Sequence, residues 1–275
     1  MALLLHLSDT HFGTEIPAVV AALLDLSRRL KPDVAVLSGD VTQRARRAQF
    51  EAAATFMQAL QAHAKLVLPG NHDLPLFNLW GRCTAPYAGF ERVFGPHGDV
   101  VIDTPTFLVL GVDTTRPWRH QAGEVSRQQV SDTAQRLRKA RPGQLKVVVT
   151  HQPLAVITPQ DHRNLLRGGE LAIKAWREAG ADLMLGGHIH LPYAVPLALQ
   201  HGDRTHGARP WVVQAGTATS TRLRGGWPNM VNVIEWQPPG QGSPGRGCCW
   251  LMQYHYVTAA RCFAQAGPPL VVRAG

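Results

Sequence analysis

The sequence has few cysteines, few charged residues and no long apolar run. Its four cysteines, in 275 residues, form no C-x-x-C spacing, so neither a disulfide framework nor a cysteine zinc site is predicted. Charged residues are 17% of the chain and hydrophobic residues 45%, a balance that excludes global disorder. No stretch approaches the roughly 20 apolar residues of a membrane span, and no secretory signal is visible. We therefore expect a soluble cytoplasmic protein with reduced thiols and no membrane partner.

Length and charge limit the organisation and the partners. Residues 1–275 show no internal repeat and no linker, so we predict a single domain whose tail is loosely held from about residue 265. Basic residues exceed acidic ones by 28 − 19 = +9, which favours anionic partners in general. The excess is almost all arginine, and a compositional bias explains it at least as well as a binding face. Nucleic acid is thus a possible but not a favoured partner, and nothing predicts an oligomeric state.

Short apolar runs alternate with segments of helical periodicity in the first seventy residues. Strands are predicted at 2–7, 34–37 and 66–68, with helices between them, which is typical of βαβ units and a parallel sheet. Further strands are predicted at 107–112, 145–149 and 183–185, with helices at about 126–140 and 169–179. After residue 190 only strands are predicted, at 211–215, 231–236 and 249–257. The fold class is therefore α/β.

Polar residues follow five of these strands directly. They include two aspartates, an asparagine and five of the thirteen histidines: Asp9, His11, Asp40, Asn71, His72, His151, His188 and His190. Each one alone has an ordinary explanation as a turn former or helix cap. Because the carboxyl ends of parallel strands converge on one crevice, the joint pattern predicts a site. Carboxylate and imidazole ligands without thiolates suit Mn, Fe or Zn ions.

The motifs also occur in a specific order. They are Asp9-x-His11, Gly39-Asp40, Gly70-Asn71-His72-Asp73, His151 and Gly187-His188-x-His190. In order and spacing this series resembles the calcineurin-like metallophosphoesterases, and it spans residues 9–190. The resemblance implies a four-layer α/β/β/α sandwich of two mixed β-sheets flanked by helices. It also implies a cofactor of two divalent metal ions, Mn²⁺, Fe²⁺/Fe³⁺ or Zn²⁺.

The same resemblance assigns roles to the residues. The first ion goes to Asp9, His11 and His190, the second to Asn71, His151 and His188, and Asp40 bridges both. A hydroxide between the ions then attacks phosphorus in line. His72 resembles a catalytic histidine that assists the leaving group, and Asp73 is expected to orient its ring.

Substrate-binding residues are less well marked. The resemblance implies that Asn71 and His72 lie beside the substrate phosphate. Arg116 and His120 belong to a basic, aromatic loop that could grip a phosphate or a base, although solvated loop charge explains them equally. Arg222 follows another predicted strand and could lie at the edge of the site.

Charge arithmetic favours a diester. Two dications and two aspartates leave +2, and a hydroxide leaves +1, which a phosphodiester monoanion neutralises. A dianionic monoester exceeds this balance by one charge, unless an arginine compensates for it.

This sequence lacks features of other branches of the family that it resembles, and these differences indicate which branch is most similar. Val41-Thr42-Gln43 is not the acidic-aromatic run of the protein Ser/Thr phosphatases, and the 85 residues after His190 are too few for the capping domain of repair nucleases. The pattern is most similar to the small bacterial class III cyclic-nucleotide phosphodiesterases. A small phosphodiester such as a cyclic nucleotide is the expected substrate. The alternatives are a DNA or RNA nuclease of the same fold, a phosphomonoesterase and a non-catalytic scaffold.

Overall fold

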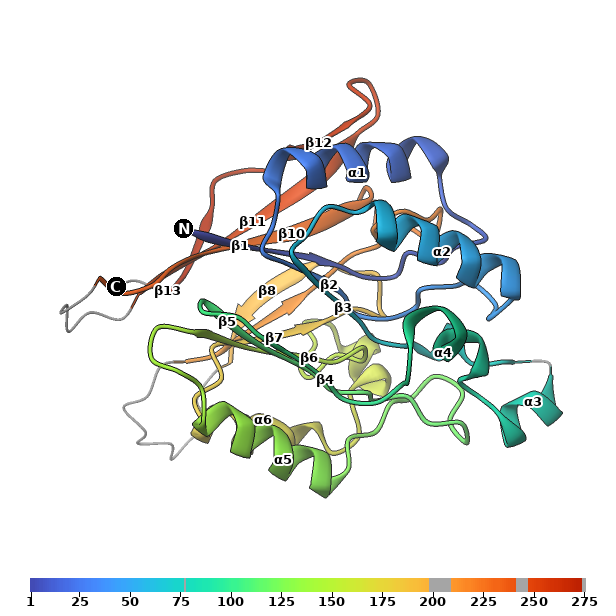
Figure 1. Ribbon diagram of the computed structural model, residues 1–275, viewed down its shortest axis with the longest axis horizontal. Helices are drawn as coiled ribbons and strands as arrows, with labels where there is room; N and C mark the ends of the chain where they lie inside the picture. Colours follow the sequence, from blue (N-terminus) through green and yellow to red (C-terminus); the bar gives the residue numbers. More distant parts are fainter. Residues whose placement is uncertain (77, 198–208, 241–246, 274–275) are drawn as a thin grey trace.

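Two β-sheets form the centre of the molecule (Figure 1). The computed structural model describes residues 1–76, 78–197, 209–240 and 247–273. Among them, the first sheet has the order β12 (Cys262–Gln265), β11 (Cys248–Val257), β10 (Met230–Gln237), β1 (Ala2–Leu7), β2 (Val34–Leu37), β3 (Ala64–Val67), with β13 (Leu270–Arg273) paired to β11. The second has the order β4 (Val100–Asp103), β5 (Phe107–Gly111), β6 (Leu145–Val149), β7 (Leu183–Gly186), β9 (Trp211–Gln214), β8 (Tyr193–Pro196).

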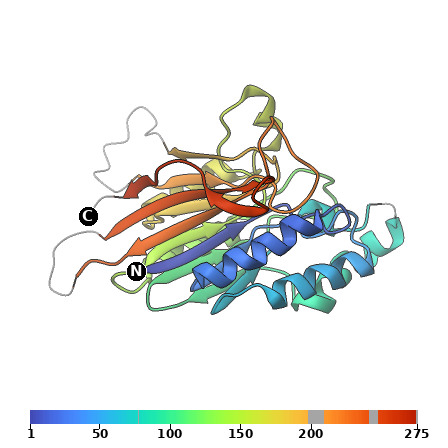
Figure 2. The ribbon, with the colours of Figure 1, turned by 90° about the horizontal axis from the view of Figure 1, so that it is seen from above.

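Helices cover the outer face of each sheet. On the first sheet lie α1 (Pro17–Leu30) and α2 (Arg47–Ala59), and on the second lie α5 (Arg127–Arg138) and α6 (Gly169–Glu178) (Figures 1 and 2). The short α3 (Leu79–Thr84) and α4 (Ala88–Phe94) connect the two halves. The predicted α/β/β/α sandwich of two mixed sheets is confirmed.

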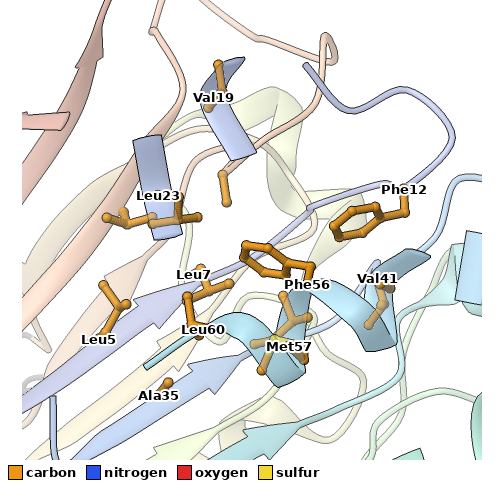
Figure 3. Packing of buried hydrophobic residues seen from close by; sticks show 14 of the residues in the cluster. Leu5, Leu7, Phe12, Val19, Leu23, Ala35, Val41, Phe56, Met57 and Leu60 are labelled. Carbon is orange, nitrogen blue, oxygen red and sulfur yellow. The ribbon is translucent and has the colours of Figure 1, made fainter. Parts of the chain in front are cut away.

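The pleat of each strand explains why the layers form. Along β1, Leu5 and Leu7 face the helices, where they pack with Leu23 of α1 and Phe56 of α2 (Figure 3). Leu4 of the same strand faces the other way, into the apolar layer between the sheets. Strands with two buried faces read as continuous apolar runs, which is why β1 and β2 were recognisable in the sequence.

Parallel pairing places the ends of the central strands together. β1, β2 and β3 are parallel, as are β5, β6, β7 and β9. β10 returns antiparallel to β1, so the first sheet is mixed. The carboxyl ends of β1, β2, β3, β6 and β7 therefore open on the same edge of the sandwich.

Some elements differ from the sequence prediction. The strand predicted at 66–68 is Ala64–Val67, and the edge strands β4, β8 and β12 were not predicted. The tail was expected to be loosely held from residue 265, but Leu270–Arg273 pairs with β11. Arg273 also forms an ion pair with Asp182, with Nη1 2.7 Å from Oδ1. The prediction was wrong for this segment because strand pairing and a distant carboxylate hold it.

No helix in the described part of the chain is long and apolar enough to cross a membrane.

Candidate metal centre

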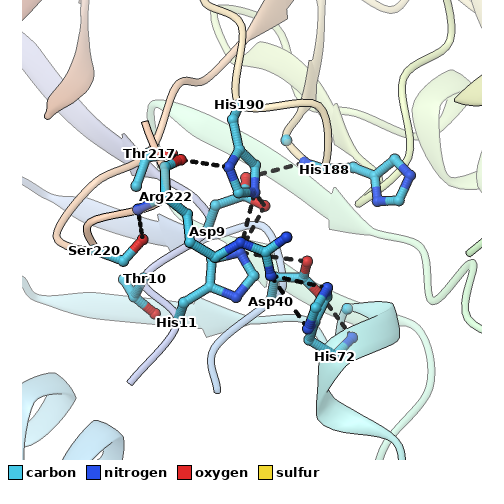
Figure 4. A network of polar contacts seen from close by, with 12 residues as sticks. Asp9, Thr10, His11, Asp40, His72, His188, His190, Thr217, Ser220 and Arg222 are labelled. Carbon is cyan, nitrogen blue, oxygen red and sulfur yellow. Dashed lines mark hydrogen bonds and ion pairs between the residues drawn. The ribbon is translucent and has the colours of Figure 1, made fainter. Parts of the chain in front are cut away.

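The eight polar residues predicted from the strand ends lie at this common edge. Asp9 and His11 follow β1, Asp40 follows β2, and Asn71 and His72 follow β3. The other three come from the second sheet, after β6 and β7: His151, His188 and His190. Figure 4 shows side chains from both sheets gathered in one network.

The backbone at five of these positions is in the left-handed region. The φ angles are positive at Asp9 (55°), His11 (44°), Asp40 (49°), His188 (72°) and His190 (58°). Residues other than glycine rarely adopt this conformation, although Asp and His tolerate it better than most. Such strain persists only where surrounding contacts enforce it, and it concentrates at functional sites.

Two glycines permit the close approach of the ligands. Gly39 has φ of 111°, and a Cβ there would lie 2.4 Å from Nδ1 of His151. A Cβ on Gly187 would lie 2.5 Å from Oδ2 of Asp9. The motif glycines therefore leave room for side chains that come from other strands.

A first group of donors is formed by Asp9, His11, Asp40 and His190. Nε2 of His190 lies 3.2 Å from Oδ1 of Asp9 and 3.1 Å from Nε2 of His11. Nδ1 of His190 donates to the carbonyl of Arg222 at 2.6 Å, so Nε2 of the neutral ring carries its lone pair toward this group. Nε2 of His11 is 3.6 Å from Oδ2 of Asp40.

A second group is formed by Asp40, His151 and His188. Asn71, which the motifs assign to the same ion, has a buried Oδ1 without a hydrogen-bond partner. Nδ1 of His151 donates to the carbonyl of Ser38 at 2.9 Å, and its Nε2 lies 3.3 Å from Oδ1 of Asp40. Asp40 thus turns one oxygen toward each group, as a bridging ligand would.

Buried donor atoms without a hydrogen bond are consistent with one cation in each of the two groups. Within the described ranges, these atoms include Oδ1 of Asp9, Oδ1 of Asn71, Nε2 of His151 and Nδ1 of His188. A buried polar atom without a hydrogen bond is costly, and a cation in each group would account for all four. Mixed carboxylate, amide and imidazole donors suit Mn, Fe or Zn.

Electrostatics within the cluster depend on burial and on the two aspartates. Burial lowers the pKa of His151, but the Asp40 carboxylate outweighs it and raises the pKa to about 9. Burial, with a smaller contribution from the nearby His151, lowers the pKa of His188 to about 4. Burial acts against ionisation of Asp9, yet His190 and His11 hold the pKa of its carboxyl well below the usual range. A cation bound by Nε2 of His151 would have to displace a proton from this ring.

His72 lies beside the first group, but Asp73 does not orient its ring. The His72 ring is perpendicular to that of His11, with centroids 4.9 Å apart, and its Nδ1 lies 3.0 Å from the carbonyl of Gln43. The Asp73 carboxylate instead accepts hydrogen bonds from the backbone of Gly70, Val41 and Thr42 at 2.7–2.9 Å. The prediction for Asp73 was wrong, because its side chain folds back onto the amides of its own turn and joins the two motif loops.

Arg222 is the one basic candidate that the structure brings to the cluster. Its Nη1 lies 3.1 Å from Nε2 of His72 and 3.2 Å from Oε1 of Gln43. Arg116 is directed elsewhere: its guanidinium donates to the carbonyls of Asp113 and Thr115 and to Gln129. A phosphate-binding role for Arg116 is therefore not supported, because its donors stabilise its own loop.

The remaining candidate is His120, which is exposed on the same loop as Arg116. Its binding role stays a prediction.

Two supporting residues were missed in the sequence. Ser38 orients His151 through its carbonyl, and Gln43 orients His72 in the same way. Both act through the backbone, so their side-chain types carried no signal. The only indication of these roles was that both residues lie within three positions of the Gly39-Asp40 motif.

Comparison with known proteins agrees with this geometry. The family model for calcineurin-like phosphoesterases matches residues 2–192, more than half of the chain. The chain therefore belongs to the calcineurin-like phosphoesterase family, and the resemblance predicted from the motifs is confirmed. Within this family, the two donor groups that share Asp40 form a candidate dimetal site. A search of curated protein sequences finds no match.

Solved structures share the fold. A purple acid phosphatase, PPD1, from yellow lupin (Lupinus luteus) superposes with a TM-score of 0.68 and 11% identity over 92% of this chain and 51% of that chain. A dimetal phosphatase from Danio rerio has a TM-score of 0.58 and 12% identity, with 98% of each chain covered. This chain thus spans about half the length of the lupin protein. At these identities the likeness shows the fold alone.

Proposed function

We propose that this chain hydrolyses small phosphodiesters, cyclic nucleotides first among them, and that its metal ligands are those predicted from the motifs. The observation that carries the proposal is the pair of donor groups that share Asp40, with the His72 ring beside them. Two divalent ions held there would activate water and neutralise charge on the phosphate. This arrangement supports attack on a phosphorus atom near Asp40.

His72 is suited to protonate the leaving group. The carbonyl of Gln43 binds Nδ1, and Nη1 of Arg222 lies 3.1 Å from Nε2. Nε2 is therefore the ring atom that can exchange a proton with substrate, once a bound phosphate draws the Arg222 guanidinium away from it. The backbone N–H of His72 donates to Oδ1 of Asp40 at 2.9 Å, so the ring is tied to the bridging ligand. An alkoxide leaves a diester poorly unless it is protonated, and His72 is in place to supply that proton.

Arg222 supports a second candidate, a phosphomonoesterase. Its Nη1 lies 3.1 Å from Nε2 of His72 and donates to the lone pair of the neutral ring. The same guanidinium can turn to donate to the oxygens of a phosphate bound beside His72. The sequence-based charge balance favoured a monoanionic diester by one charge. Arg222 adds one positive charge and thereby removes that preference.

The distinguishing experiment is a substrate panel on the Mn²⁺-loaded enzyme. The panel contains cyclic AMP, cyclic GMP, a 2′,3′-cyclic nucleotide, bis(p-nitrophenyl) phosphate, p-nitrophenyl phosphate and single-stranded DNA. The proposal predicts the highest kcat/KM for cyclic nucleotides. A cyclic-nucleotide rate no higher than the generic diester rate would remove that assignment, and a highest rate on the monoester would favour the second candidate.

Cleavage of the DNA strand with strongly salt-dependent binding would instead indicate a nuclease, because phosphate contacts release counterions.

A further inference from the structure

The segment that carries His188 and His190 requires support from outside itself. Both residues have positive φ, 72° and 58°, and Ile189 lies between them. The N–H of His188 donates to Oδ2 of Asp9 at 3.0 Å, and the ring of His190 is held by the carbonyl of Arg222. These contacts fix the two histidines but leave the peptide carbonyl between them to another partner.

Arg224 is that partner. Its Nη1 donates to the carbonyl of Ile189 at 2.9 Å. The same guanidinium forms a two-pronged pair with Asp161, with Nη1 2.8 Å from Oδ1 and Nη2 3.0 Å from Oδ2. One arginine therefore joins the ligand-bearing turn to a carboxylate on a different loop.

The Asp161 carboxylate that accepts these hydrogen bonds is buried and has further partners. Its side chain is 3% exposed, and it accepts further hydrogen bonds from Thr158 at 2.5 Å and Asn164 at 3.2 Å. It lies in the 3₁₀ turn Pro159–Asn164, in the loop that follows His151. The pair thus connects the loops after β6, β7 and β9, and two of these loops carry the ligands of the second sheet.

We propose that Arg224 and Asp161 are positioning residues that hold the turn at Ile189, so that His188 and His190 present their donor atoms to the two cations. The proposal rests on the dimetal site described above and concerns how tightly that site binds metal. Neither residue belongs to either group of metal-ligand donors. The pair acts on the ligands through the backbone, as the outer partners of metal ligands do elsewhere.

The test measures Co²⁺ binding rather than turnover. Apoprotein is titrated with Co²⁺ against a competing chelator, and the visible absorption of the bound ion reports its coordination geometry. In Arg224→Gln and Asp161→Asn we expect about 10- to 100-fold weaker binding, the usual effect of losing an outer partner. We also expect an altered absorption spectrum. Arg224→Lys keeps the positive charge and N–H donors but cannot form the two-pronged pair. It should therefore retain more of the Co²⁺ affinity than Arg224→Gln does.

Arg119→Gln is the matched control. Arg119 also pairs with a carboxylate, Glu124, through Nε at 2.8 Å and Nη2 at 2.5 Å, and its side chain is 27% exposed. That pair lies on the loop after β5 and includes no metal ligand. Its loss should leave the Co²⁺ affinity and spectrum unchanged, whatever it does to the melting temperature.

The outcomes separate this inference from the proposed function. If wild type binds two Co²⁺ ions and the folded Arg224 and Asp161 variants bind them within threefold, with the same spectrum, the positioning role is wrong and the phosphoesterase proposal stands. A wild-type protein that binds no Co²⁺ would overturn both. Asp161→Asn preserves the shape of the side chain, so it provides the measurement if Arg224→Gln does not fold.

Discussion

Nη1 of Arg222 lies 3.1 Å from Nε2 of His72, although 150 residues separate them in the sequence. The carbonyl of Arg222 also accepts the hydrogen bond from His190. One residue thus reaches the predicted proton donor with its side chain and a predicted metal ligand with its backbone. A substitution of the side chain leaves the carbonyl in place, which makes the two contributions separable.

Arg222→Gln should therefore change substrate preference more than metal binding. A dianionic monoester gains more from a guanidinium than a monoanionic diester does. We expect kcat/KM to fall about tenfold or more for p-nitrophenyl phosphate, equivalent to about 1.4 kcal/mol or more, and by less than about threefold for the bis-ester. Equal losses of kcat/KM on both substrates would show that Arg222 does not discriminate between the dianionic and the monoanionic phosphate. Arg47→Gln serves as the control for a general effect of removing a surface arginine, because Arg47 is 77% exposed on α2 and pairs with Glu51 there.

Asp40→Asn should abolish binding of both ions together. Asp40 turns Oδ2 toward His11 and Oδ1 toward His151, and an amide cannot offer two anionic oxygens. We expect metal content to fall well below two ions per chain, and turnover on every substrate to fall by more than about 100-fold. Elemental analysis after dialysis, with kinetics on the same sample, measures both. Asn71→Ala is the comparison, because it should weaken only the second ion.

His72→Ala should retain both ions and lose turnover. Its ring is not in either cation group, and it packs edge-on against His11. We expect kcat to fall by about 100- to 10,000-fold on cyclic nucleotides, whose alkoxide needs a proton, and much less on nitrophenyl esters. Similar losses on good and poor leaving groups would contradict the acid role. Loss of metal in this variant would instead make His72 a ligand.

The strand-end residues were predictable because their positions depend on chain order. Once β1, β2 and β3 are recognised as parallel strands, Asp9, Asp40 and Asn71 must lie at one edge of a sheet. The order and direction of the strands alone therefore predict that these three residues converge.

The other contacts depend on loops and side-chain rotamers. Arg222 reaches His72 through the loop after β9, and Arg116 turns back onto its own loop, yet both are basic residues after a strand. Asp73 adjoins His72 but bonds to the amides of Val41 and Thr42. Neither periodicity nor motif spacing distinguishes these outcomes, because each is decided by hydrogen-bond donors from distant segments.

His6, which is not itself a predicted ligand, provides a test of pH dependence. It is fully buried on β1, with Nε2 3.0 Å from Oγ of Ser38 and Nδ1 3.3 Å from Nδ2 of Asn232. Burial lowers the pKa of His6 from 6.5 to about 3, and the charge of Asp9 offsets only part of that effect. Between these two pH values the unfolded chain binds a proton that the folded chain excludes. The contribution of His6 to the free energy of unfolding is therefore fully present above about pH 6.5, and it is lost as the pH falls toward 3.

His6→Gln removes this titration while keeping a side chain that can hydrogen-bond to Ser38. From pH 7.5 to 5, wild type should lose about 2 kcal/mol more free energy of unfolding than the variant, since each pH unit below 6.5 contributes about 1.4 kcal/mol. Urea unfolding in the presence of a chelator measures this without metal linkage. His63→Gln is the control, because His63 is 81% exposed and should leave the pH profile unchanged. Parallel profiles for wild type and His6→Gln would mean that His6 accepts a proton in the folded state, and the polar contacts between β1, β2 and β10 would then have to accommodate a charge.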